Sequence, residues 1–485
     1  MLNEALVHSR KLVLSSIFFM VLFFVLHACG PVTSHYLIVE DNLLRGDAVS
    51  ADAVVEKNKD DYGERSEVLY DMDRGMTLHL AGRYQESNQI LEEAEQRIED
   101  LFTKRVTNEA AAFLTNDNLL PYEGEDFEKV MINIVRALNY MYLGDTDNAL
   151  VEARKVDQKL NVINDKYADK KNAYKEDAFA RYLAGILYEA GGKQELNEAW
   201  ISYRKSMATF KDYAALYKTP IPNIVIQDVM RLTDALGQQD IASEIKKEFP
   251  NIEWRLAKDI KGQGELIFLS YNGRAPKKED NFLDIPLSPE AIAIVLATGN
   301  RNNDVKTAAR GIAALQGKII RLALPRFVPQ RSEVAYAEVS LIGKDGGSIF
   351  SGRTILMEDI TAIAIRNLDD RIIRITAKAV ARAAVKKLIA LSVEKKAEKE
   401  GGALAGMILG GVANAAAFAT EQADKRSWRT LPDEIQVARI GIPPGTYDLQ
   451  VKYIARNGSV IDLKVFHNIL IKAGEKKFMS NRIVR

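Results

Sequence analysis

The residue whose type and position most clearly predict chemistry is Cys29, the only cysteine in the chain. It directly follows an apolar run at 12–26 and directly precedes a polar stretch. A thiol in that position predicts a covalent attachment point. The run begins after the basic pair Arg10 and Lys11 and ends next to small Ala28, which is the layout of a cleavable export signal over residues 1–28.

Side chains for catalysis are scarce in the rest of the chain. After residue 28 the histidines are His35, His79 and His467, which stand far apart, and no second cysteine supplies a thiolate. A Cys/His zinc site within one chain and catalysis by a cysteine nucleophile are therefore excluded. We expect no metal, no cofactor and no enzymatic activity.

Two sets of charged residues offer alternatives. A hydrolase of envelope glycans needs a pair of carboxylates, and the acidic set that we would test consists of Glu265, Glu279, Asp280 and Asp284. A site for an anionic sugar or lipid headgroup needs arginines, and the candidates are Arg274, Arg426, Arg429 and Arg439. Trp428 lies among these arginines, and we expect it to fill a junction between two parts of the fold.

The Leu-His-Ala-Cys sequence at 26–29 resembles the lipobox of bacterial lipoproteins, although the family prefers a smaller residue than His27. The resemblance implies that Cys29 is diacylated and becomes the first residue of the mature protein, and two or three acyl chains hold a protein firmly on a membrane. Gly30 stands where an aspartate would retain the protein at the inner membrane, so we expect an outer-membrane anchor. The alternative is an uncleaved transmembrane helix, for which the run is slightly short.

Composition bounds the remaining possibilities. The 485 residues suggest two or three domains, and the 47% hydrophobic and 27% charged fractions are typical of a globular protein. A net charge of zero gives no overall field that would attract nucleic acid. Because no cysteine pair exists, the fold must rely on its packed core rather than on disulfides.

Residues 29–65 predict a tether and a first helix, and residues 66–258 show helical periodicity throughout. Four turns within this part share a glycine between two helical patterns, namely Gly82, Gly144, Gly192 and Gly237. They resemble the central turn of a tetratricopeptide repeat (TPR), where glycine allows the helix to end. Their spacing exceeds the usual ~34 residues, and an irregular helical bundle is the alternative. A repeat array predicts a concave face that binds a partner protein.

Residues 259–358 and 427–485 change to the alternation of strands, with turn residues such as Asn457-Gly458 between them. About eight short strands predict an antiparallel, immunoglobulin-like β-sandwich. A strand at 264–271, a turn and loop at 272–278, and a hairpin of 334–342 with 348–356 are expected within it. The predicted fold class is therefore α+β and multidomain.

A helical insertion at 359–426 interrupts the predicted sandwich, with an amphipathic part at 372–391 and a charged link at 394–400. Behind the link, Gly402, Gly406 and Gly410 recur at every fourth residue beside a charge-free segment, 403–420. Such a stripe permits very close helix contact. It predicts a buried hairpin partner, an oligomer contact, or a segment that enters the membrane.

The stretch 423–432, followed by Ile435, Ala438-Arg439 and 443–445, resembles the C-terminal signature of an uncharacterised family of TPR-containing lipoproteins of Gram-negative bacteria; 272–277 is similar to a second family stretch. The resemblance implies a place in the cell envelope. We therefore expect a periplasmic, lipid-anchored protein that binds or scaffolds other envelope components through its TPR-like groove. The alternatives are a structural subunit of a membrane-associated homo-oligomer and the glycan hydrolase.

Overall fold

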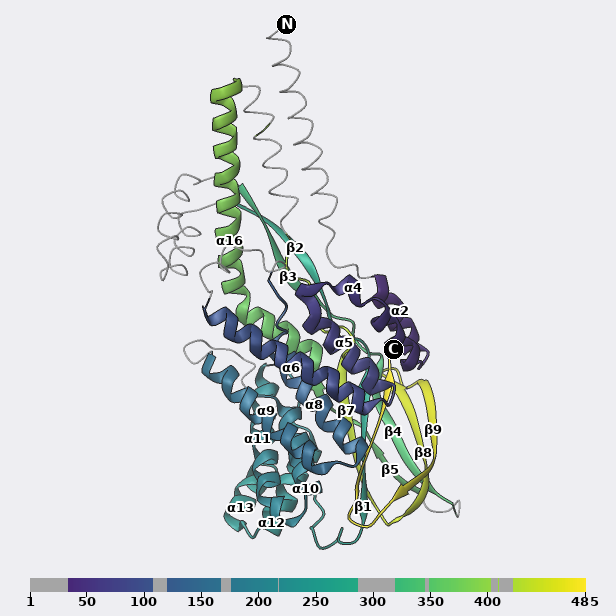
Figure 1. The fold of residues 1–485 in the computed structure, drawn as a ribbon. Coiled ribbons are helices and arrows are strands. Elements are labelled where there is room, and N and C mark those ends of the chain that lie inside the picture. The colour runs from purple at the N-terminus through teal and green to yellow at the C-terminus, as the bar shows by residue number, and fades with distance from the viewer. Residues whose placement is uncertain are drawn as a thin grey trace.

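The structure is a computed structural model that describes residues 34–107, 120–166, 176–216, 218–286, 319–344, 349–402, 409 and 422–485. Cys29, Gly406 and Gly410 lie outside the described residues. Helices form one side of the molecule and two sheets form the other, with one long helix extending away from both (Figure 1). The described chain begins with α2 (Ser34–Leu44), α3 (Ala48–Lys57) and the short α4 (Lys59–Tyr62).

The following helices pair into four hairpins. The pairs are α5 (Glu67–Leu80) with α6 (Tyr84–Thr107), α8 (Asp126–Leu143) with α9 (Thr146–Lys166), α10 (Ala178–Ala190) with α11 (Leu196–Leu216), and α12 (Asn223–Ala235) with α13 (Gln239–Glu248). The four predicted glycines lie at the four turns with φ of 76°, 77°, 100° and 71°, so the predicted turns are confirmed. Their wide spacing arises because helices such as α6 and α11, of 24 and 21 residues, are long.

Close helix contact within two of these hairpins depends on a second glycine, seven residues before the turn glycine. A Cβ added at Gly75 would overlap Leu91 of α6, and one added at Gly185 would overlap the Tyr203 ring of α11. Both large side chains are fully buried against the bare backbone of the facing helix. These glycines therefore set the distance between the two helices of each pair.

The first helix of each hairpin lies between the second helices and a sheet. In α8 and α10 almost every side chain along 126–139 and 178–188 is buried, whereas the outer helix α13 buries only Ala242 and Ile245. A helix that is buried all round must have partners on two sides. The inner faces of α5, α8, α10 and α12 are therefore covered by other parts of the chain.

In the described part of the chain, ten strands form two four-stranded sheets and a ribbon. The inner sheet has the order β10-β1-β7-β6, from β1 (Gly264–Asn272), β6 (Ile355–Asp359), β7 (Glu434–Ile442) and β10 (Lys476–Ile483). The outer sheet has the order β5-β4-β8-β9, from β4 (Val334–Gly343), β5 (Ile349–Arg353), β8 (Gly445–Ala455) and β9 (Val460–Ile471). The ribbon pairs β2 (Lys277–Pro286) with β3 (Ile319–Val328).

A helical part and antiparallel sheets are thus as expected, but four details differ, and the immunoglobulin-like topology is not confirmed. The last strand, β10, runs parallel to β1, because the chain returns to the inner sheet after crossing to the outer one. The strand expected at 348–356 divides at Thr354, where β5 leaves the outer sheet and β6 joins β7. The predicted loop at 272–278 ends in β2, which belongs to the ribbon rather than to the sandwich.

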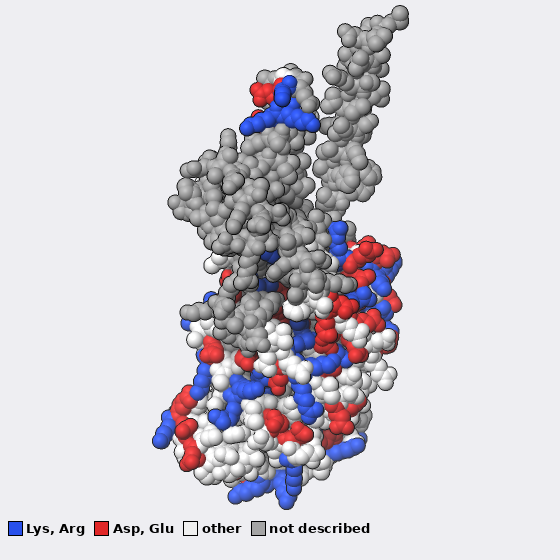
Figure 2. All heavy atoms as spheres, turned by 60° about the vertical axis from the view of Figure 1, so that its left-hand side comes forward, with Lys and Arg blue, Asp and Glu red and all other residues white. Residues whose placement is uncertain are grey.

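The fourth difference is the predicted charged link, which is helix. Helix α16 runs without interruption from Ile360 to Gly401, since 394–399 consist of the strong helix formers Glu, Lys and Ala. Its 42 residues correspond to about 63 Å. The helix packs against α8, β3 and β7, and its far end projects from the body beside the ribbon (Figure 1). We call α16 and the β2–β3 ribbon together the arm. Acidic and basic side chains are mixed on the described surface of the body and at the end of the arm (Figure 2).

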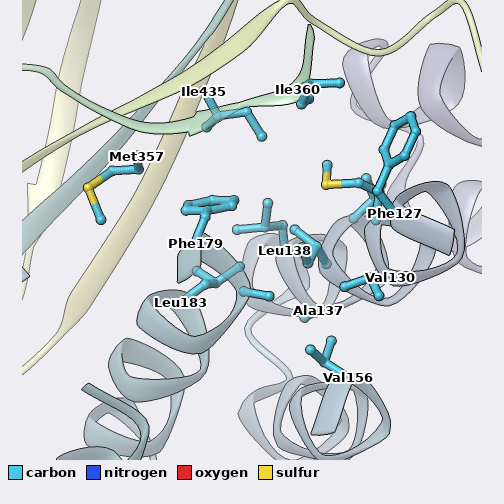
Figure 3. Packing of buried hydrophobic residues seen from close by; sticks show 14 of the residues in the cluster. Phe127, Val130, Ala137, Leu138, Val156, Phe179, Leu183, Met357, Ile360 and Ile435 are labelled. Atoms are coloured by element: carbon cyan, nitrogen blue, oxygen red, sulfur yellow. The ribbon is translucent and has the colours of Figure 1, made fainter. Parts of the chain in front are cut away.

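The core forms two layers on either side of the inner sheet. Alternate residues of β1 point to opposite faces. Leu266 and Phe268 pack with outer-sheet residues such as Leu449, and Ile267 and Leu269 belong to the cluster that includes the helices. In Figure 3, Phe179 and Leu183 of α10 and Leu138 of α8 lie beneath Ile435 of β7 and Met357 of β6. The helical and sheet parts therefore share one continuous core.

Candidate functional site

A set of buried charges lies where the hairpins meet the inner sheet. We call it the Arg439 cluster, after the guanidinium of β7 at its centre. Arg439 donates to Glu189 of α10 (2.7 Å), to Asp228 of α12 (2.8 Å) and to the hydroxyl of Tyr203 of α11 (2.9 Å). It also pairs with Glu265 of β1. One side chain thus joins three helices to two strands.

Two further cations complete the Arg439 cluster. Arg231 pairs with Glu189 at 2.7 Å and with Asp228 at 2.9 Å, and Lys476 of β10 pairs with Glu265 at 2.6 Å. Three carboxylates therefore face three cations, which is the balance that burial of charge requires. Burial raises the pKa of Glu265, but Arg439 and Lys476 outweigh it and lower that pKa to about 2.

A second buried network, the Trp428 junction, joins α8 to the segment that enters β7. The backbone N–H of Trp428 donates to Glu128 at 2.7 Å, its indole N–H donates to Thr430 at 2.9 Å, and the side chain is 1% exposed. Glu125, at the N-terminus of the same helix, pairs with Lys278 of β2 and Arg371 of α16. This network therefore fixes the base of the arm to the hairpins.

A third set of contacts joins the N-terminal helices to the same segment. Glu40 of α2 accepts from Arg429 at 2.7 Å and from Arg274 at 3.2 Å. Asp73 of α5 accepts from the hydroxyl of Tyr36 at 2.7 Å and from the Thr430 hydroxyl at 3.0 Å. Burial raises the pKa of Asp73 to about 6, against the lowering effect of these hydrogen bonds.

The predicted arginine site is not a single site. Arg274 and Arg429 meet at Glu40, whereas Arg439 lies in its own cluster. Arg426 donates to Asp424 and to the carbonyls of Arg65 and Leu120. Each of the four guanidiniums binds a carboxylate or carbonyl of the chain itself, so they hold segments together instead of converging on one ligand.

The acidic set proposed for glycan hydrolysis is divided between two places in the fold. Glu265 belongs to the Arg439 cluster, while Glu279, Asp280 and Asp284 lie on β2 and pair with Lys277, Lys425 and Arg321 respectively. Hydrogen bonds from Lys277 and Arg321 lower the pKa of Glu279 and Asp284. A general acid needs a raised pKa, whereas the pKa is lowered at these two residues and at Glu265.

The structure describes one glycine of the predicted stripe and the helix faces of the predicted groove. Gly402 is the residue that ends α16, with φ of 81° and no atom within 4 Å of an added Cβ. Gly406, Gly410 and the lipidation site Cys29 lie outside the described residues. The inner faces of α8, α10 and α12 contact other parts of the chain: Glu128 accepts from the backbone N–H of Trp428, and Glu189 and Asp228 accept from Arg439 of β7.

Sequence reasoning missed most members of the Arg439 cluster. Glu189 and Asp228 lie 250 and 211 residues from Arg439 in the chain. The available signal was local: Glu189 is the one carboxylate in the apolar helix Ala178–Ala190. A charge in a helix that is apolar on every side predicts a buried partner.

The described residues offer neither a metal site nor a membrane-spanning helix. No group of histidine, cysteine, aspartate and glutamate within them is suited to hold a metal ion. Among the helices they include, none combines the length and the apolar character needed to cross a membrane.

Comparisons with known proteins add little. No protein-family model matches the sequence, and the search of curated proteins gives no match. Two solved structures show weak similarity, both of a Podosopora anserina putative kinesin light chain with nearly identical TPR-like repeats, one of them a single-residue variant. Each is 14% identical, covers 45% of this chain and 92% or 93% of the other, and gives a TM-score of 0.30 or 0.29. At that level the similarity carries no argument here, and the repeat character rests on the four hairpins.

Proposed function

We propose that this protein is a lipid-anchored scaffold of the bacterial cell envelope. In this proposal, acylated Cys29 holds it on the periplasmic side of the outer membrane, and the arm binds another envelope component. The observation that supports it is the use of the inner helix face by the chain's own sheet. A repeat array normally binds its partner on that face, so in this proposal the partner binds elsewhere.

The position of Cys29 relative to α2 fits an anchor. Helix α2 begins at Ser34, five positions after Cys29, and a chain of that length spans at most about 18 Å. An acylated Cys29 therefore keeps α2 close to the bilayer. Leu37 and Ile38 on the first turns of α2 are 69% and 54% exposed, and apolar side chains beside an anchor support shallow contact with lipid.

Membrane fractionation tests the anchor. A soluble-export signal replaces residues 1–28 and Cys29 becomes serine, and this variant is compared with the wild type after a high-salt wash. We expect the wild type in the membrane pellet and the variant in the periplasmic extract. If the variant remains with the membrane, the acyl chains are not what holds the protein there.

The arm is proposed as the binding element because it projects from an otherwise closed body. Apolar side chains on it are exposed in the described part of the structure: Phe282 and Ile319 on the ribbon are 53% and 59% exposed, and Ile373 on α16 is 72% exposed. Large exposed apolar residues that gather on one element are typical of protein-binding surfaces. The Trp428 junction holds the base of the arm, so binding at the arm is transmitted to a rigid body.

Site-specific photocrosslinking in cells tests the arm. A photoreactive amino acid at Ile373 or Phe282 should yield a crosslinked species of defined mass. The matched controls are Val151 and Val162 on the outer helix α9, which are 44% and 57% exposed. Crosslinks from α9 positions without crosslinks from the arm would show that the partner binds the helical side, contrary to the proposal.

A further inference from the structure

Strand β9 is the free edge of the outer sheet. It has 12 residues and pairs only with β8 among the described strands, so one row of its backbone groups is unpaired. The opposite edge, β5, has only five residues, and the outer strands of the inner sheet, β10 and β6, contact helices. A long exposed edge strand is a template for pairing with another strand.

The side chains of β9 alternate in an unusual way. Asp462 and Lys464 lie opposite Tyr453 and Val451, which are completely buried, so these two charges sit on the inner face of the outer sheet. They pair with each other at 3.2 Å. Leu463 lies on the outer face opposite Lys452, and it is 47% exposed.

Inward charges on an edge strand normally prevent association, because an added apolar strand would leave them without partners. A second copy of β9 is an exception, because the order of its charges can give each inward charge a partner of opposite sign. When two copies pair antiparallel about a two-fold axis at Leu463, Asp462 of each lies opposite Lys464 of the other. Opposite charges placed directly across two strands stabilise the pair.

Other two-fold registers lack this match. An axis at Lys464 would place lysine against lysine, and an axis at Asp462 would place aspartate against aspartate. The left-handed Asn468 (φ 59°) and the irregular pairing of β8 with β9 near Leu449 end the regular part of the strand after Phe466. A second register shift between β8 and β9, between Tyr453 and Ile454, begins the regular part at Asp462. The pairing segment is therefore 462–466, which contains Leu463 and both charges.

We infer that two copies of this chain associate through β9, which joins their outer sheets into one continuous sheet of eight strands. The interface is isologous, so the same residues of both copies take part. Backbone hydrogen bonds between the two edges provide the attraction, and the Asp462–Lys464 pairs select the register and exclude unrelated strands. This inference is independent of the lipid anchor and of the arm.

Charge reversal tests the register. The full chain is purified in detergent, and its mass is measured by light scattering with the detergent contribution subtracted. The wild type should have twice the mass of one mature chain. Asp462→Lys and Lys464→Asp should each raise the dissociation constant at least tenfold, and the double reversal should restore it to within about threefold. A matched control, Asp284→Lys, alters another exposed cross-strand ion pair and should leave the mass unchanged.

Disulfide capture tests proximity without relying on affinity. Leu463→Cys places a thiol at the axis, where directly paired residues have Cβ atoms about 4.5–5.5 Å apart, and it should give a covalent dimer under mild oxidation. Ile349→Cys, on the opposite edge and 63% exposed, should not. A wild type that is monomeric at every concentration, or a double reversal that fails to restore the dimer while its circular dichroism is native, would overturn the inference.

Discussion

Replacement of Arg439 by methionine should break the connection between the hairpins and the inner sheet. Methionine fills a similar volume but offers no donor, so Glu189, Asp228 and Glu265 lose their common partner. Arg231 and Lys476 still contact these carboxylates, which leaves three buried negative charges against two positive ones. Removing one partner of a buried ion pair typically costs about 3–5 kcal/mol.

The pKa of Glu265 gives an independent magnitude. Its ordinary pKa of 4.5 falls to about 2 in the folded protein, and such a difference corresponds to about 3 kcal/mol of stability at neutral pH. Because the folded pKa is lowered, this stability is present above pH 4.5 and is lost as the pH falls towards 2. The difference between wild type and Arg439→Met should therefore be largest at pH 7 and should shrink below pH 4.5.

Urea unfolding, followed by far-UV circular dichroism and by tryptophan fluorescence at pH 7 and pH 3.5, measures this difference. The control is Arg353→Met, which removes a guanidinium that pairs with Glu338 at the surface and is 64% exposed. A surface change of this kind alters stability by about 0.5 kcal/mol or less. A loss below about 1 kcal/mol for Arg439→Met, or an equal loss at both pH values, would show that these ion pairs do not hold the hairpins to the inner sheet.

Two further predictions concern buried positions. Burial raises the pKa of Glu358 well above its usual range, and the negative charge of Asp177 raises it further. The folded protein therefore favours the protonated side chain. The stability that this side chain gives to the fold is fully present below pH 4.5 and is lost as the pH rises through the folded pKa. Glu358→Gln should therefore raise the midpoint of urea unfolding at pH 8 but not at pH 4, and no gain at pH 8 would contradict this cause. Gly185→Ala should destabilise the fold by about 1–3 kcal/mol, because the added methyl group overlaps Tyr203. Helix propensity alone would instead make alanine stabilising by about 1 kcal/mol. Thermal unfolding of the variant distinguishes the two effects by the sign of the change.

The features that the sequence predicted well depend on local chemistry. The turn glycines, such as Gly144, require a left-handed backbone that few other residues adopt. Strand β1 was evident because a run buried on both faces is apolar at nearly every position. Strand β2 escaped notice because its sequence, KKEDNFLDIP, is mostly polar and pairs only within the ribbon.

The features that the sequence did not predict depend on contacts between distant segments. Arg439 was recognised as a charged residue of interest, but its partners are fixed by the packing of α10 and α12 on the inner sheet. The same packing covers the helix face that a repeat array usually leaves open. The parallel return of β10 beside β1 likewise has no local signal, because residue patterns specify a strand but not its neighbour.

The claim that the hairpins and the inner sheet form one unit is tested most directly by native-state hydrogen exchange. The amides of α10 (Ala178–Ala190) and of β7 (Glu434–Ile442) are compared in the wild type and in Arg439→Met. We predict that both segments open with the same free energy in the wild type, and that Arg439→Met lowers it in both together. If α10 exchanges independently of β7, with the variant affecting only one of them, the hairpins and the inner sheet do not form one unit.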